Sequence, residues 1–264
     1  MKVSYRGADV HLATGGKPLD SAKKTVIFLH GSGQSHLGFA LQTRYFASEG
    51  YNVLAPDFPG HYLSGGTPLN RIEDMADWLA GLMAELGIEK ATVAGHSQGC
   101  LVALAMAKLY PQHVEKLVLI AGALSIPVND QLLSSAKKNQ IAAIHMMTSW
   151  GHGQAAHLFD HPVPGQAHLG YGTAQMKANH QDALHADLSA CQAFDGGPEA
   201  ADSVSVPALV VLAKKDKMTP LKRGREMAQS IAGAQLVELE QSGHMIPSEA
   251  PEILNRHLVS FLKS

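Results

Sequence analysis

The segment Gly95-His96-Ser97-Gln98-Gly99 places a hydroxyl group between two glycines. It follows a short apolar run typical of a buried strand and opens a longer run of helical composition. A serine at such a strand-to-helix turn projects its hydroxyl from the edge of a sheet, and the glycines allow strand and helix to approach closely. The start of the helix adds the free N–H of Gln98 and the positive end of the helix dipole. The pattern therefore predicts Ser97 as a nucleophile in acyl transfer.

Strand-like and helix-like segments alternate on both sides of this turn, which predicts βαβ units and a parallel sheet. The predicted strands are Thr25–Leu29, Asn52–Ala55, Ala91–Ala94, Lys116–Ile120, Ala208–Leu212 and Gln235–Glu240. The predicted helices are Gly38–Ser48, Ile72–Leu86, Gln98–Leu109, Leu221–Ile231 and Ala250–Leu262. Helix Gln98–Leu109 is apolar on almost every side, so we expect it to be buried against the sheet. The predicted fold class is α/β, with a mostly parallel central sheet and helices on both faces.

The alternation stops after Ile120. Residues 123–201 contain two helix-like parts, Asp130–Trp150 and Thr173–Phe194, separated by a segment rich in Gly and Pro. We therefore predict an α-helical cap at residues 123–203, inserted into a core made of residues 1–122 and 204–264.

Composition restricts the partners. Hydrophobic residues make up 45% of the 264 residues, and the net charge is −2 with no run of like charge, so we expect neither a nucleic-acid partner nor membrane insertion. Two cysteines, Cys100 and Cys191, are too few for a disulfide framework, and the N-terminus lacks the apolar stretch of a signal peptide. We expect a cytoplasmic protein that is a monomer or a homodimer.

The serine turn resembles the nucleophile elbow of the α/β-hydrolase family, which places an acid after a late strand and a histidine after the last strand. In this chain Asp216 follows Ala208–Leu212, and His244 follows Gln235–Glu240. The resemblance implies a Ser97–His244–Asp216 triad. In that triad His244 takes the proton of Ser97, and Asp216 orients the imidazole and stabilises its cation.

Two further loops resemble the family. The loop His30-Gly31-Ser32-Gly33-Gln34 resembles its oxyanion loop, which implies N–H donors at Ser32 and Gln98, although Gly31 could replace Ser32. The loop that begins at Asp57 departs from the family at Tyr62, where glycine is usual. We expect Asp57 to hold this loop and not to act in catalysis.

The cap offers candidates for a substrate pocket. We predict that Met147 and Trp150 line it together with Gly31 and Met245, although the two cap residues could equally form the cap core. The cap histidines match no ligand spacing of a zinc site, so we expect solvated or locally hydrogen-bonded histidines, no metal and no cofactor. These histidines are His145, His152, His157, His161 and His168.

Serine at the elbow excludes the family members that attack with Asp, namely haloalkane dehalogenases and epoxide hydrolases. Residues 123–206 contain no arginine, and Met245-Ile246-Pro247 follows the histidine. Carbon–carbon bond hydrolases of the family typically have an Arg near the pocket and often a Trp after the histidine. We therefore expect a carboxylesterase that cleaves a small to medium carboxylic ester through an acyl-enzyme. The alternatives are a thioesterase, a carbon–carbon bond hydrolase, or a non-catalytic small-molecule receptor.

Overall fold

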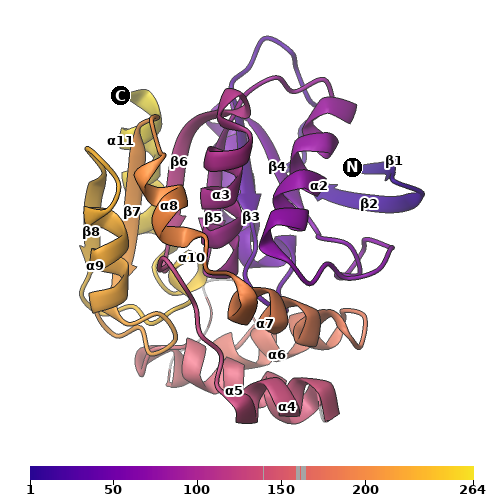
Figure 1. The fold of residues 1–264 in the computed structure, drawn as a ribbon, viewed down its shortest axis with the longest axis vertical. Helices are drawn as coiled ribbons and strands as arrows, with labels where there is room; N and C mark the ends of the chain where they lie inside the picture. Colours follow the sequence, from indigo (N-terminus) through magenta and orange to yellow (C-terminus); the bar gives the residue numbers. More distant parts are fainter. Residues whose placement is uncertain (139, 159–160, 162–164) are drawn as a thin grey trace.

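The computed structural model describes residues 1–138, 140–158, 161 and 165–264, and its strands form one sheet (Figure 1). The strands follow the order β1-β2-β4-β3-β5-β6-β7-β8. Their bounds are β1 Lys2–Tyr5, β2 Ala8–Ala13, β3 Thr25–Leu29, β4 Asn52–Pro56, β5 Ala91–His96, β6 Val114–Ile120, β7 Ala208–Ala213 and β8 Gln235–Leu239. Strands β3 to β8 pair in parallel, whereas β2 pairs antiparallel with both β1 and β4. The predicted mostly parallel sheet is confirmed.

Helices cover both faces of the sheet because the strand residues alternate between two apolar layers. Ile27 and Leu29 point into a layer formed with α2 (Ile72–Glu85) and α3 (Gln98–Leu109). Val26 and Phe28 point into the opposite layer, formed with α1 (Ala40–Ser48) and α11 (Pro251–Lys263). Side chains buried on both faces explain why these strands are continuous apolar runs. Helix α3 is buried from Gln98 to Ala107, as expected.

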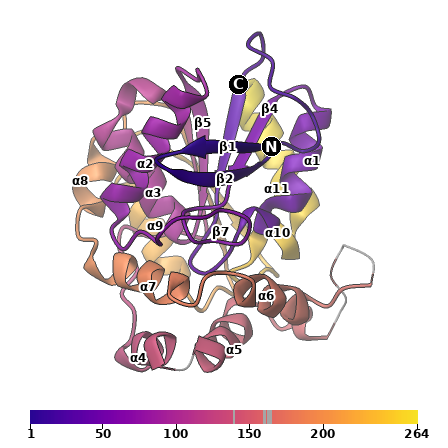
Figure 2. The same ribbon diagram turned by 90° about the vertical axis from the view of Figure 1, so that its right-hand side faces the viewer.

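Four helices between β6 and β7 gather at one end of the sheet (Figures 1 and 2). They are α4 (Asp130–Lys138), α5 (Gln140–Gly151), α6 (His168–Lys177) and α7 (Ala183–Ala193), and we call them the α4–α7 layer. The predicted helix Asp130–Trp150 is thus described as two helices, and residue 139 between them lies outside the described residues. The same holds for residues 159, 160 and 162–164 of the predicted Gly- and Pro-rich loop. The boundaries of the cap stay a prediction.

The remaining helices pack against the sheet and its helices or lie next to them in the chain. Helix α8 (Gly197–Asp202) packs against α3, although it falls inside the predicted insertion. Helix α9 (Leu221–Gln229) packs on β7, and the short α10 (Ile246–Glu249) directly precedes α11. The part of the chain that the structure describes also contains three 3-10 helices: η1 His36–Phe39, η2 Pro111–His113 and η3 Ala155–His157. No helix among the described residues has the length and apolar character needed to cross a membrane.

Candidate active site

Ser97 occupies the turn between β5 and α3 in a conformation that side chains rarely adopt. Its backbone has φ 55° and ψ −119°, and the residue is 8% exposed. The Ser97 N–H donates to the carbonyl of Ile120, 3.0 Å away on neighbouring strand β6. A non-glycine residue with positive φ is strained, and such strain persists where the surrounding structure fixes it. The turn therefore has the geometry of the predicted nucleophile elbow.

The two glycines of the elbow are needed for space. A Cβ on Gly95 would clash with the backbone of Gly99, and a Cβ on Gly99 would clash with the carbonyl of Leu29. The start of α3 thus lies directly against β5 and β3. This close approach was the expected reason for glycine at both positions.

His244 and Asp216 form a buried pair. The Nδ1 atom of His244 lies 2.8 Å from Oδ2 of Asp216, and the two residues are 2% and 8% exposed. Burial alone would raise the pKa of Asp216, but His244 and the N–H and hydroxyl of Thr219 lower it overall. Asp216 is therefore an ionised acceptor that directs the Nδ1–H of His244 and leaves Nε2 free of hydrogen bonds to the described residues.

His96, the neighbour of Ser97, joins the elbow to the histidine loop. Its Nε2–H donates to the backbone carbonyl of His244 at 2.9 Å, and the two rings lie 4.8 Å apart. Burial first, and then the nearby His244, lower the pKa of His96 to about 3, so this ring is neutral. The structure thus joins the elbow, through His96, to the buried pair of His244 and Asp216, and the catalytic role of Ser97 with this pair stays a prediction.

The predicted oxyanion loop lies against the elbow. A Cβ on Gly31 would come within 3.1 Å of the Cβ of Ser97, so the backbone at Gly31 and Ser32 passes next to the nucleophile. Ser32 is 6% exposed. Gln98 is the first residue of α3, so its N–H has no acceptor within the helix. Ser32 and Gln98 are well placed as donors, and their role stays a prediction.

Two of the predicted pocket residues, Met147 and Met245, contact other side chains, and a third, Trp150, is exposed. Met147 is buried among apolar side chains of the α4–α7 layer, and the sulfur of Met245 lies 3.2 Å from the side-chain nitrogen of Gln34. Trp150 is 39% exposed. The buried face of α5 contains Ile144, Met147, Thr148 and Gly151, and Trp150 falls outside it. Trp150 therefore does not belong to the cap core, and its place in a substrate pocket stays a prediction.

The histidines of the α4–α7 layer are less exposed than expected. His152, His161 and His168 are 5–6% exposed, whereas His145 and His157 are exposed. The rings of His161 and His168 lie 4.8 Å apart, and burial lowers the pKa of His168 to about 4. The expected histidines were solvated or locally hydrogen-bonded: His152 is of the second kind, because its Nδ1 lies 2.8 Å from the carbonyl of Thr148, whereas none of the three is solvated.

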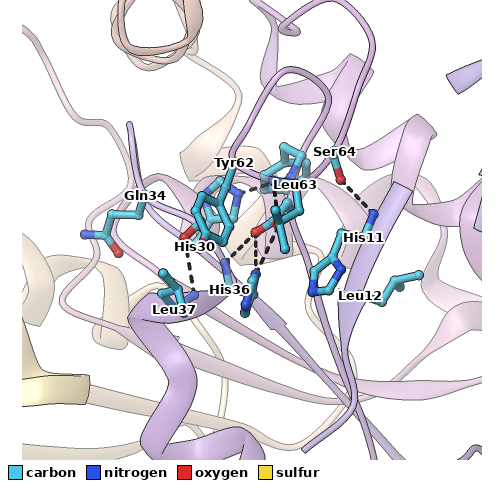
Figure 3. Close-up of polar contacts among 12 residues, drawn as sticks. His11, Leu12, His30, Gln34, His36, Leu37, Tyr62, Leu63 and Ser64 are labelled. Carbon is cyan, nitrogen blue, oxygen red and sulfur yellow. Dashed lines mark hydrogen bonds and ion pairs between the residues drawn. The ribbon is translucent and has the colours of Figure 1, made fainter. Parts of the chain in front are cut away.

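Asp57 holds its loop through hydrogen bonds, in agreement with the expected structural role. Its carboxylate accepts the backbone N–H of His36 at 2.7 Å and lies 2.9 Å from the Nδ1 atom of the His36 ring. His11 stacks beside His36 with ring centres 4.6 Å apart (Figure 3). Ligand atoms of these three residues lie within 4.8 Å of one another, a spacing that a metal ion could bridge. The hydrogen bonds to Asp57 explain the cluster without one.

A groove of about 960 Å³ lies beside edge strand β8, away from the elbow. Its walls include Leu236, Glu249, Ile253 and His168, and it contains none of the predicted catalytic or pocket residues. The volume of a cavity therefore does not locate the site that the hydrogen bonds around His244 and Asp216 indicate.

Glu249 is a functional candidate that the sequence analysis missed. Its carboxylate accepts three backbone N–H groups: Gly243 at 3.1 Å and Met245 at 3.0 Å on either side of His244, and Gly153 at 2.9 Å beyond the end of α5. A Cβ on Gly153 would lie 2.9 Å from the nitrogen of Gly243, so the two loops touch through their backbones. Glu249 thus fastens the histidine loop to the α4–α7 layer.

Replacing Glu249 with Gln should loosen this loop, because an amide offers one acceptor oxygen where the carboxylate offers two. Hydrogen bonds to charged groups contribute about 1.5–3 kcal/mol. We expect kcat to fall by about tenfold with KM little changed, as measured by steady-state hydrolysis. Glu252→Gln, an exposed carboxylate at the start of α11, is the matched control and should behave as wild type. Full activity in a folded Glu249→Gln protein would show that this carboxylate does not position His244.

The comparisons with known proteins agree with this geometry. A model of the alpha/beta hydrolase fold family matches residues 24–251. A 2-hydroxy-6-oxononadienedioate/2-hydroxy-6-oxononatrienedioate hydrolase of Paraburkholderia phymatum is 26% identical, over 92% of this chain and 88% of its own.

Solved structures agree as well. The enol-lactonase from Burkholderia xenovorans LB400 superimposes with a TM-score of 0.89 and 25% identity over the full length of both chains. The esterase from Exiguobacterium antarcticum shares the fold, with a TM-score of 0.87 and 21% identity over 100% of this chain and 99% of its own. The chain therefore belongs to the α/β-hydrolase fold family.

Proposed function

We propose that this hydrolase cleaves a small to medium neutral carboxylic ester or lactone through an acyl-enzyme on Ser97. The observation that carries the proposal is the buried pair of His244 and Asp216, bonded through Nδ1 of His244 and joined by His96 to the strained elbow at Ser97. A serine next to an imidazole whose tautomer is fixed by a carboxylate is the arrangement that activates a hydroxyl nucleophile.

The chemistry follows from these positions. Nε2 of His244 takes the proton of the Ser97 hydroxyl as its oxygen attacks the ester carbonyl, and the N–H groups of Gln98 and Ser32 stabilise the oxyanion. His244 then gives that proton to the departing alkoxide, and the acyl group stays on Ser97. Water, deprotonated by His244, releases the acid in the second half. A lactone would yield a hydroxy acid by the same steps.

The charge distribution favours a neutral substrate. Of the 21 Lys and Arg side chains, all except Lys108 and Lys116 are exposed. Lys108 pairs with Glu199, and Lys116 donates to the carbonyl of Phe261 at the end of α11. Neither ammonium group is directed at Ser97. A carboxylate on the substrate would thus be buried without a Lys or Arg partner from the described residues, which is costly.

Carbon–carbon bond hydrolysis is the second candidate, because relatives at 26% identity are named for it. The substrates in the names of these relatives carry one or two carboxylates, and among the described residues no buried Lys or Arg is directed at Ser97 to pair with such a group. The resemblance to an enol-lactonase and the charge distribution together favour ester or lactone cleavage.

A substrate panel separates the two candidates. We expect p-nitrophenyl acetate, butyrate and octanoate to be hydrolysed with a kcat/KM at least about a hundredfold above that for 2-hydroxy-6-oxo-6-phenylhexa-2,4-dienoate. This ratio corresponds to about 3 kcal/mol for an unpaired carboxylate. Loss of dienoate absorbance and release of p-nitrophenol report the two reactions. Preference for the dienoate would replace our proposal with carbon–carbon bond hydrolysis.

The triad should behave as a unit. Ser97→Ala, His244→Ala and the double variant should each lose kcat by a similar factor, on the order of 10⁶, because each change disables the same step. Asp216→Asn should lose less, about 10⁴-fold. Ester turnover and circular dichroism on the same preparations check activity and folding. Multiplication of the two single losses in the double variant would show that the residues do not act together.

A further inference from the structure

The loop that follows β3 is held by side chains from the α4–α7 layer. The Gly33 N–H donates to Oδ2 of Asp187 at 2.7 Å, and the Gly33 carbonyl accepts from the side-chain amide of Asn179 at 2.7 Å. The N–H of Ser35 donates to the amide oxygen of Gln175 at 2.9 Å. These contacts begin one residue beyond Ser32, so the layer fixes the backbone that carries a predicted oxyanion donor.

Asp187 is the charged member of this set. It lies on α7, is fully buried, and accepts from Nε2 of His61 at 2.9 Å in addition to the Gly33 N–H. Nδ1 of His61 lies 3.1 Å from the carbonyl of Pro59. Both ring nitrogens of His61 therefore face acceptors, so both carry a proton. The resulting imidazolium balances the charge of Asp187. Burial would lower the pKa of His61, and the Asp187 carboxylate raises it overall.

The same carboxylate also reaches the second predicted donor. Oδ1 of Asp187 lies 3.3 Å from the side-chain nitrogen of Gln98, whose backbone N–H is at the start of α3. The buried carboxylate of Asp187 thus accepts a hydrogen bond from Gly33, the residue after Ser32, and another from the side chain of Gln98. The neighbouring His30 differs from His61. Its Nε2 accepts from the N–H of Phe58, and burial lowers its pKa to about 4, so it adds no charge.

The fit between α7 and the loop is close. Gly33 has φ +67°, and a Cβ there would lie 2.9 Å from a methyl carbon of Leu184 on α7. The hydroxyl of Ser32 lies 3.6 Å from the sulfur of Cys191, also on α7. The loop therefore has apolar contacts with α7 as well as polar ones, and it cannot keep this geometry if α7 moves away.

We propose that Asp187, paired with His61, is a positioning residue that sets the geometry of the oxyanion hole from the α4–α7 layer. The inference rests on the proposed acyl transfer at Ser97. Donors must lie 2.7–3.1 Å from the oxyanion, and loss of one donor costs about 10²–10³ in kcat. A displaced donor should lower kcat by less than the loss of a donor does. It should weaken the binding of the transition state more than the binding of the substrate.

Asp187→Asn tests the proposal with a change of charge at nearly constant shape. We expect kcat for p-nitrophenyl butyrate to fall by about 10–100-fold, with KM within about twofold of wild type. The affinity of a trifluoromethyl ketone should fall by the same factor, because its tetrahedral adduct on Ser97 places an oxyanion in the hole. Agreement of the two factors is a readout that a purely structural role would not produce.

Asp182→Asn provides the matched control. Asp182 lies at the start of the same helix, its side chain is 71% exposed, and the substitution is identical. It should leave kcat, KM and inhibitor affinity unchanged. The double variant Asp187→Asn, His61→Gln removes the unpaired imidazolium and should recover part of the activity that Asp187→Asn loses.

Asn179→Ser is the second variant if Asp187→Asn does not fold, because Asn179 is half-buried and uncharged; the change removes its bond to the Gly33 carbonyl and its bond from the Tyr62 N–H. It should lower kcat and inhibitor affinity together by about three- to tenfold. Wild-type kcat and inhibitor affinity in a folded Asp187→Asn or Asn179→Ser protein would overturn the inference while leaving the proposed function intact. A wild-type protein that hydrolyses none of the esters would instead refute the proposed function, and the inference with it.

Discussion

The close approach of α3 to β5 is the constraint on which the rest of the site depends. It requires glycine at both ends of the elbow and fixes Ser97 at φ 55°. The cost of that conformation is of order 1–3 kcal/mol. The surroundings offset it: α3 is buried through most of its length, and the Ser97 N–H bonds to β6. Ser97, the proposed nucleophile, is therefore positioned by the centre of the core, whereas its proposed partners His244 and Asp216 lie on loops.

Three carboxylates organise those loops, each by accepting N–H groups. Asp216 binds Nδ1 of His244, Glu249 binds the backbone on either side of that histidine, and Asp187 binds the oxyanion loop. Glu249 and Asp187 also join these loops to the α4–α7 layer. Charged acceptors form stronger hydrogen bonds to N–H groups than neutral ones, which suits segments that lack the support of a sheet. The α4–α7 layer thus bonds to the loops that carry the proposed site.

The hydrogen-bond partners of the buried histidines explain their different charge states. His61 faces two acceptors and is cationic, whereas His96 is fully buried beside His244 and is neutral. Both are among the 15 histidines of the chain, and the sequence offers no means of distinguishing them. The distinction arises from contacts such as that between His61 and Asp187, which are 126 residues apart.

The sequence predicted the parallel sheet, the buried helix and the positions of Ser97, Asp216 and His244, because local signals mark strands, turns and the residues that follow them. It did not reveal Asp187 or Glu249. Most of their partners are backbone N–H groups, which almost every residue has, so these contacts leave no signal in the sequence. It also left open whether Trp150 lies in the cap core, because a helix with apolar residues on several sides does not show which face is buried. A carboxylate at the helical spacing of apolar residues, as Asp187 is with Leu184 and Cys191 in α7, is the signal that could have been used.

The central claim is that Ser97 is a nucleophile activated by His244, and covalent trapping tests it most directly. The protein is incubated with a fluorophosphonate, and the adduct is located by mass spectrometry of the digested chain. We expect one adduct per chain, on Ser97, formed at least about 10³-fold more slowly in His244→Ala, because an unassisted serine hydroxyl is a weak nucleophile. Labelling of another residue, or of Ser97 at the same rate in His244→Ala, would contradict the account.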